Sequence, residues 1–127
     1  MQSLFSDRSF TAVREFSRNL GLGDVRPVED GSVSFEFDQA GTFSITPARD
    51  KERMLLSLTQ DKGRLLADDL KGLFFLSGWD SILEAPVSAG MSSKGEVVLV
   101  VSLGVERQTL QTIELALDRL IQLHGAN

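Results

Sequence analysis

Apolar residues recur at steps of three and four over the first twenty residues. The positions between them carry mostly charged and polar side chains, and Gly21 and Gly23 follow the last one. This spacing is typical of an amphipathic helix with one buried side. We therefore expect a first helix from about residue 6 to residue 20, whose apolar side holds Phe10, Val13, Phe16 and Leu20.

Three short segments that follow have the patterns of strands: the first two alternate between apolar and polar residues, and the third is mostly apolar. They span residues 33–37, 42–46 and 54–58, with turn-forming residues between the first two. Alternation with a period of two predicts strands with one buried face. Short connections favour antiparallel neighbours, so this part of the chain predicts three adjacent antiparallel strands.

The second half of the chain predicts a helix, two strands and a final helix. A leucine-rich stripe within residues 61–76 indicates a second helix, and Gly78 is expected to end it. Residues 87–91 suggest a weak strand, joined by the turn at residues 92–95 to a strong strand over residues 96–103. The last helix places five apolar residues on one stripe before His124 and Gly125: Leu110, Ile113, Leu117, Leu120 and Ile121.

The strand at residues 96–103 is the expected centre of the fold. Six of its eight residues are apolar, which is typical of a strand buried on both faces. The final helix covers one face, so the other requires a second helix or another copy of the chain. The predicted fold class is α+β, in one domain over residues 1–127, with an antiparallel sheet of about five strands and three helices in the order α-β-β-β-α-β-β-α.

Composition limits the classes of partner. With a net charge of -5 and a pI near 4.8, the chain lacks the basic surface that nucleic acid or an anionic membrane requires. It has no cysteine, and its N-terminus lacks a basic start followed by an apolar core. We expect a cytoplasmic protein that binds neither nucleic acid nor membrane.

The usual residues of catalysis are scarce. The one histidine, His124, falls in the last helical turn, where we expect it to face solvent or cap the helix. Asp68 and Asp69 are adjacent on the predicted second helix and point apart, which suits a solvated face better than a metal site. We therefore predict no enzyme, no metal and no cofactor. The rival hypothesis is a small hydrolase or isomerase that works through carboxylates such as Asp30, Glu36 or Asp38.

Two apolar groups exceed what one buried face requires. The first consists of the phenylalanines of the first helix and the first hairpin, and the second runs from Leu73 to Leu76 with Trp79. Each group can belong to the core. Alternatively, the first suits a groove that binds an extended peptide beside a strand edge, and the second suits a twofold dimer contact.

Three stretches give the chain a family resemblance. The first is the helix ending in residues 16–22, with Glu29-Asp-Gly31 and an alternating strand that closes at Asp38. The second is the strand at residues 54–58 leading into the leucine-rich helix, and the third is the turn at Lys94-Gly95 entering the strong strand and last helix. In these features the chain resembles the class I chaperones of bacterial type III secretion, the Tir-chaperone (CesT-like) family.

The resemblance implies a chaperone without catalytic activity. Such proteins dimerise and bind the extended N-terminal segment of a secreted effector, which keeps it soluble and export-competent. By position, the effector-binding residues would be Phe10, Val13, Phe16, Phe35, Phe37, Phe43 and Ile45. The dimer-interface residues would be Leu66, Leu70, Leu73, Phe74, Trp79, Val87, Ala89 and Met91.

The resemblance leaves two kinds of partner subunit open. A homodimer is expected, but the last third of the chain also resembles subunits that pair with a different chaperone to handle a secretion gatekeeper protein. The alternative is a small α+β regulatory or sensory domain of similar topology that binds the folded surface of another protein.

Overall fold

The computed structural model describes residues 5–23, 25–48, 53–61 and 77–125. These residues form a sheet of six strands with two α-helices and a short 3-10 helix. In chain order the elements are α1 (Asp7–Asn19), β1 (Val33–Phe37), β2 (Gly41–Pro47), β3 (Arg53–Gln60), β4 (Gly78–Asp80), β5 (Ala85–Met91), β6 (Val97–Gly104), η1 (Val105–Arg107) and α3 (Leu110–Gly125).

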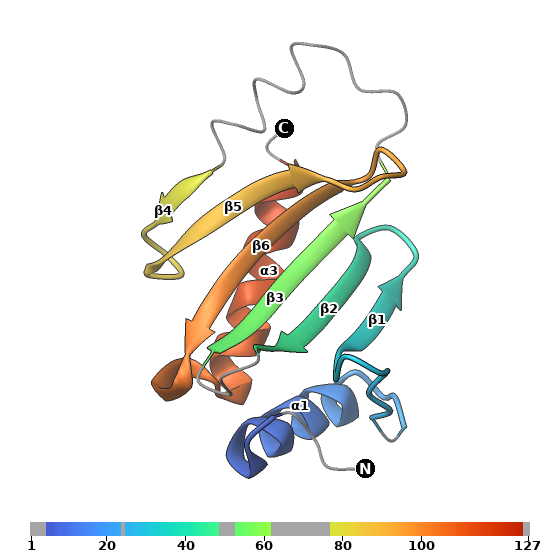
Figure 1. Ribbon diagram of the computed structural model, residues 1–127, viewed down its shortest axis with the longest axis vertical. Coiled ribbons are helices and arrows are strands. Elements are labelled where there is room, and N and C mark those ends of the chain that lie inside the picture. The colour runs from blue at the N-terminus through green and yellow to red at the C-terminus, as the bar shows by residue number, and fades with distance from the viewer. Residues whose placement is uncertain (1–4, 24, 49–52, 62–76, 126–127) are drawn as a thin grey trace.

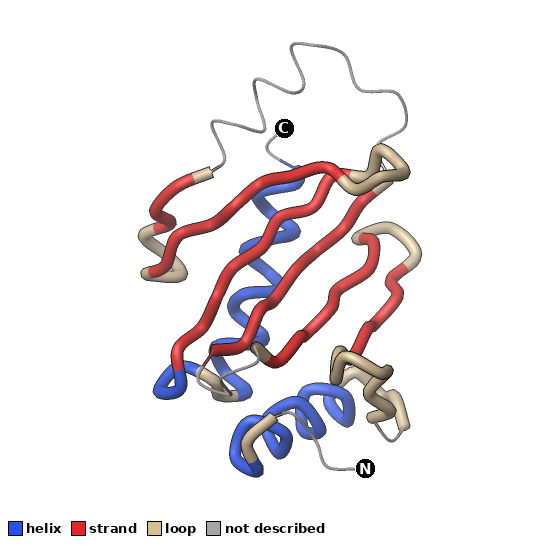
Figure 2. Tube along the Cα trace, viewed as in Figure 1, coloured by secondary structure: helices blue, strands red, loops and turns tan. Residues whose placement is uncertain are grey.

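The strands form a single antiparallel sheet in the order β1-β2-β3-β6-β5-β4 (Figure 1). Helix α3 runs along one face of this sheet and packs on β3 and β6, while α1 lies across the end of the sheet near β1 and β2 (Figure 2). The two helices also contact each other. The described chain is therefore one sheet with one layer of helices.

The inner face of the sheet, towards the helices, is a continuous apolar core. Its registered rows join Phe35 to Phe43, Phe43 to Leu58 and Leu58 to Leu99. Phe16 of α1 packs edge-on against Phe35, with 5.2 Å between ring centroids, and lies 5.6 Å from Phe43. The alternating pattern places apolar side chains on this face, and their burial is the main contribution of the strands to the stability of the fold.

The outer face of the sheet is less buried than the inner face within the described residues. Along β6 buried and half-buried residues alternate: Leu99 and Val101 point inward, while Val98 and Val100 point outward and are only half-buried. On β3, the outward Leu55 is 37% exposed. Within the described residues no second layer covers this face, and the layer that the sequence predicts there, a second helix or another copy of the chain, stays a prediction.

A buried polar network joins the start of α1 to the link before α3. The Ser6 side chain caps α1 by accepting a bond from the Ser9 N–H at 3.2 Å. The Ser9 hydroxyl donates to the side-chain carbonyl of Gln108, and the Gln108 amide donates to the Leu103 carbonyl at 3.1 Å. This chain of bonds fixes α1 against the end of β6.

Two sequence-based expectations about the elements need correction. The sheet has six strands rather than about five, because Gly78–Asp80 forms β4 by pairing with β5. His124 is buried, not solvated, since the last turn of α3 packs on β3 and the Nε2 atom donates to the Leu58 carbonyl at 2.7 Å. The predicted second helix, within residues 61–76, lies almost entirely outside the described residues.

Candidate functional site

Helix α1 ends in a turn that reverses the chain and exposes an apolar side chain. Gly21, at φ 77°, lets its N–H bond to the Arg18 carbonyl at 2.9 Å, while the Leu22 N–H bonds to the Ser17 carbonyl at 3.1 Å. This pair of bonds is a Schellman motif. The Ser17 hydroxyl then donates to the Gly23 carbonyl at 3.0 Å. The turn holds Leu22 at the surface, with 49% of it exposed.

The following loop delivers the chain into β1 through a second tight turn. Val28 donates to the Ser32 carbonyl at 2.9 Å, and the Ser32 N–H donates to the Asp30 carboxylate at 2.9 Å. Hydrogen bonds from the Ser32 backbone and hydroxyl lower the pKa of Asp30, although its carboxylate is exposed. These bonds hold the turn through which β1 starts directly beside the end of α1.

Two adjoining hollows lie between the end of α1 and β1. One, of about 190 Å³, reaches along α1, and the other, of about 230 Å³, extends along β1. They share three lining residues of the loop. We name the combined depression the α1–β1 groove; its principal lining residues are Arg14, Arg18, Leu22, Val25, Arg26, Val33 and Phe35.

The groove adjoins a free sheet edge. Within the part of the chain that the structure describes, β1 pairs only with β2 and is the first strand of the sheet (Figure 1). An edge strand presents unpaired N–H and C=O groups that can pair with an additional strand. Apolar lining next to such an edge is an arrangement that can hold an extended peptide.

The predicted effector-binding residues lie mainly in the core. Phe35 forms part of the floor of the groove, and Phe10 and Phe37 are half-buried. The other four are almost fully buried: Val13, Phe16, Phe43 and Ile45. A docked segment does not reach those four side chains in this conformation, so contact with them would require α1 to move from the sheet.

The predicted dimer residues fall into three groups. Trp79 and Met91 are exposed, by 70% and 47% respectively. Val87 points into the core and Ala89 packs partly against it, because both lie on the inner face of β5. The remaining four lie outside the described residues: Leu66, Leu70, Leu73 and Phe74.

The arginines of the groove are residues that sequence reasoning did not assign to the site. Arg14 and Arg18 occupy the polar side of the first helix, and Arg26 belongs to a turn. The sequence offers only a weak indication of a basic site, namely that Arg14 and Arg18 lie four residues apart in an acidic chain. Arg26 reaches the α1–β1 groove only because the loop folds back beside α1.

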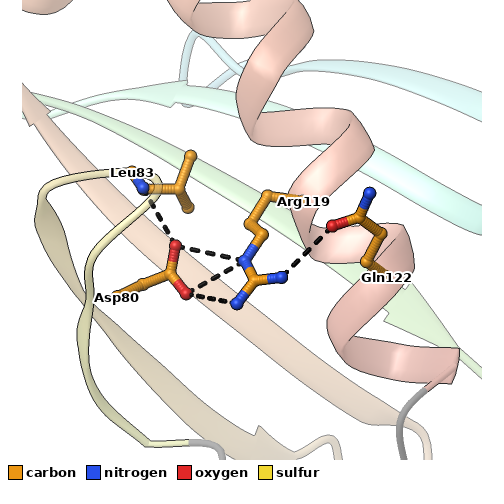
Figure 3. Close-up of polar contacts among 4 residues, drawn as sticks. All are labelled: Asp80, Leu83, Arg119 and Gln122. Atoms are coloured by element: carbon orange, nitrogen blue, oxygen red, sulfur yellow. Dashed lines mark hydrogen bonds and ion pairs between the residues drawn. The ribbon is translucent and has the colours of Figure 1, made fainter.

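The ion pair between Asp80 and Arg119 has a structural role. The carboxylate accepts from Nε and Nη2 of Arg119 and from the Leu83 N–H, and Arg119 also donates to Gln122 (Figure 3). Burial raises the pKa of Asp80, but the Arg119 and Leu83 hydrogen bonds and the arginine charge outweigh it and lower the pKa overall. This pair fastens the β4–β5 turn to α3.

The described residues that the enzyme hypothesis names do not form a catalytic site. The carboxylates of the enzyme hypothesis, Asp30, Glu36 and Asp38, are exposed and belong to a turn, a strand and another turn. Within residues 5–23, 25–48, 53–61 and 77–125, no group of three or more acidic, histidine or cysteine residues is placed to hold a metal ion. None of the helices in these ranges has the length and apolar character needed to span a bilayer.

The fold resembles that of solved secretion chaperones. A chain in the structure of the HopA1-SchA chaperone-effector complex aligns with TM-score 0.67 and 19% identity, covering 91% of this chain and 89% of that one. A chain in the structure of the Yersinia pestis type III secretion chaperone SycH, in complex with a fragment of YscM2, aligns with TM-score 0.67 and 13% identity, covering 94% and 99%. A chain of the ExsC-ExsE complex aligns with TM-score 0.62 and 21% identity, covering 89% and 85%. At these identities the similarity establishes the fold.

The family follows from the sequence match. We found no match among curated proteins. Residues 10–126 match the family described as the type III secretory system chaperone SycN, a range that covers nearly the whole chain and runs from within α1 to just beyond the end of α3. The chain therefore belongs to the SycN family of type III secretory system chaperones.

Proposed function

We propose that this chain binds an extended segment near the N-terminus of a secreted effector or gatekeeper protein and keeps it soluble and export-competent. The observation that carries this proposal is the α1–β1 groove beside the free edge of β1. The family and the similarity in fold to a chain of a chaperone-effector complex support it.

The groove offers two kinds of contact to an extended segment. The backbone of the segment can continue the sheet by pairing with β1, which gives affinity with little dependence on sequence. Alternate side chains can then rest on Leu22, Val25 and the floor at Phe35. Phe35 is already packed by Phe16, so the floor is rigid and does not need to be ordered when the segment binds.

A non-covalent holder of this kind binds reversibly. An unfolded client loses conformational entropy when it is ordered, and this offsets part of the free energy from burying roughly 1,000 Å² or more. The remaining affinity is sufficient to shield the apolar segments of the client. It is also weak enough for the secretion apparatus to release the client.

The finer assignments rest on the sequence resemblance. We place the chain with the Tir-chaperone (CesT-like) class I chaperones, as a non-catalytic protein of the bacterial cytoplasm without a cofactor. It works as a homodimer or with a second chaperone subunit, through Trp79, Met91 and the predicted residues that lie outside the described ranges. The exposure of these two side chains supports their part in the contact.

The test is binding of N-terminal fragments of the secreted proteins of the native host. Each fragment is co-expressed with the full chain, and the purified complex is sized by light scattering. We expect two chaperone chains per fragment, and slower hydrogen exchange in β1 when the fragment is bound. A Leu22→Asp variant should lose the fragment, because a carboxylate enters the apolar part of the groove.

Val105→Asp is the matched control, since Val105 is 50% exposed and does not line the groove. Both variants should keep their circular dichroism. The proposal fails if no secreted fragment binds. The groove assignment fails if Leu22→Asp retains the fragment with wild-type affinity and exchange in β1 does not change.

A further inference from the structure

The charge of the α1–β1 groove is opposite to that of the chain. The sequence carries 13 basic and 18 acidic residues. Yet every charged residue among the described residues that line the groove is an arginine: Arg14, Arg18 and Arg26. Asp24, which lies in the loop between them, is outside the described residues.

These three arginines are not used by the rest of the described chain. Three arginines outside the groove have structural partners, whereas the exposed Arg8 has none among the described residues: Arg53 donates to Ser102, Arg107 to the Leu83 carbonyl, and Arg119 pairs with Asp80. By contrast, the guanidinium groups of the groove make no hydrogen bond or ion pair with any residue in the described ranges. Guanidinium groups beside an apolar surface are complemented best by carboxylates, which they can bind in a two-pronged geometry.

The spacing of the arginines matches an extended chain. Arg14 and Arg18 lie four residues apart on α1, so they are separated by about 6 Å along the helix axis. Alternate side chains of an extended segment project on one side at intervals of roughly 6.6 Å. Leu22 lines the same hollow, but it lies beyond the turn at Gly21 and not on the helical row. The two arginines therefore match acidic side chains at alternate positions of an extended segment, and Leu22 offers an apolar contact beside them.

We infer that the α1–β1 groove selects client segments that carry two acidic residues at alternate positions next to an apolar residue. Arg14 and Arg18 bind the two carboxylates, Leu22 receives the apolar side chain, and Arg26 extends the positive rim towards β1. This inference rests on the proposed function and specifies the client chemistry that the groove recognises.

The test compares charge removal inside and outside the groove. The full chain, the double variant Arg14→Gln/Arg18→Gln, and the control Arg8→Gln are each titrated with a fluorescently labelled client fragment from the preceding experiment. Arg8 lies exposed on the first turn of α1 and does not line the groove. Glutamine is a good helix former, so the fold should be retained.

We expect the double variant to weaken binding by about fivefold or more at low salt, with Arg8→Gln within about twofold of wild type. The difference should shrink as salt is raised, because exposed charge pairs are screened. A competitor peptide, Leu-Thr-Glu-Thr-Glu-Thr-Leu, should displace the fragment from wild type better than the same peptide with glutamine at both acidic positions. On the double variant the two peptides should compete equally.

The outcomes separate this inference from the proposed function. If the double variant binds like Arg8→Gln while Leu22→Asp loses the client, the groove binds clients and the arginines are only a solvated rim, so the inference is overturned. If Leu22→Asp also binds normally, the groove itself is not the client site. Equal competition by the two peptides on wild type would also overturn the inference.

Discussion

At the scale of single residues, the buried carboxylate of Asp80 is held by two other residues. The Asp80 carboxylate receives bonds from Arg119 and from the Leu83 N–H, and the combined effect lowers its pKa despite burial. A group whose pKa is lower when folded than when unfolded stabilises the fold when it is ionised. This contribution is therefore present at neutral pH and is lost as the pH falls through the folded-state pKa, below the ordinary aspartate range.

Replacing Asp80 by asparagine isolates this charge. Asparagine keeps a carbonyl oxygen for the Leu83 N–H but removes the negative charge that Arg119 binds. We expect a loss of about 1–2 kcal/mol in the free energy of unfolding at pH 7, measured by urea denaturation. The loss should decline below the ordinary pKa range of aspartate. Asp118→Asn, at an exposed position beside Arg119 on α3, is the control and should change stability by less than about 0.5 kcal/mol. A loss that does not change with pH would assign the effect to packing.

At the scale of elements, turns determine which surfaces meet. The Gly21 turn places Leu22 beside β1, and the turn before β2 sets the register of the first hairpin, in which Phe37 is opposite Gly41. Gly41 has φ 104°, and a Cβ atom there would lie 2.1 Å from the Thr59 carbonyl oxygen of β3. Only glycine fits this position, because β3 passes too close for any side chain.

Alanine substitutions at two glycines test this argument. Gly41→Ala should lower the free energy of unfolding by about 2 kcal/mol or more, since it combines left-handed backbone strain with a clash against backbone. Gly90→Ala is the matched control, because no atom lies within 4 Å of an added Cβ in β5. It should change stability by less than about 1 kcal/mol. The free energy of unfolding of both variants is measured by urea denaturation. If both variants lose the same amount of stability, the clash with the Thr59 carbonyl is not the cause.

At the scale of the whole molecule, the two edges of the sheet have different character. The β1 edge adjoins the α1–β1 groove, while the β4 edge carries the exposed Trp79. Trp79 lies opposite Pro86 on the outer face, in register between β4 and β5. A large exposed aromatic residue at a sheet edge is typical of a contact with another chain. We therefore expect separate regions of the molecule to bind the client and the second chaperone subunit.

A charge introduced at Trp79 tests the subunit contact. If the chain forms the proposed dimer through Trp79, Trp79→Glu should shift it towards monomer in sedimentation equilibrium, because the variant would bury a carboxylate in the contact. The unfolding of the monomer should hardly change, since the side chain is largely exposed. Val105→Glu, exposed to a similar degree outside both regions, should leave the dimer intact. If Trp79→Glu forms dimers to the same extent as wild type, Trp79 is not part of the interface.

Much of the fold was predictable because its signal is local. Alternation placed Phe35 and Phe43 on one face of a hairpin, and helical spacing placed Val13 and Phe16 on one side of α1. The same local patterns could not distinguish core from binding surface. Phe16 and Phe43 were candidates for contact with the client, and tertiary packing buries both. Strand β4 was missed because its three residues have no repeat of their own and form a strand only against β5.

The sequence by itself therefore determined the α+β class, the inner face of the sheet and the two described helices, because these follow from the periods of neighbouring residues. Only the tertiary structure decided the partners of its polar residues. Asp80 meets Arg119 across 39 positions, and His124 meets Leu58 across 66. The α1–β1 groove likewise exists only because two turns bring a helix end to a strand edge. Contacts between residues far apart in the sequence depend on how helices and strands pack, so local sequence patterns do not predict them.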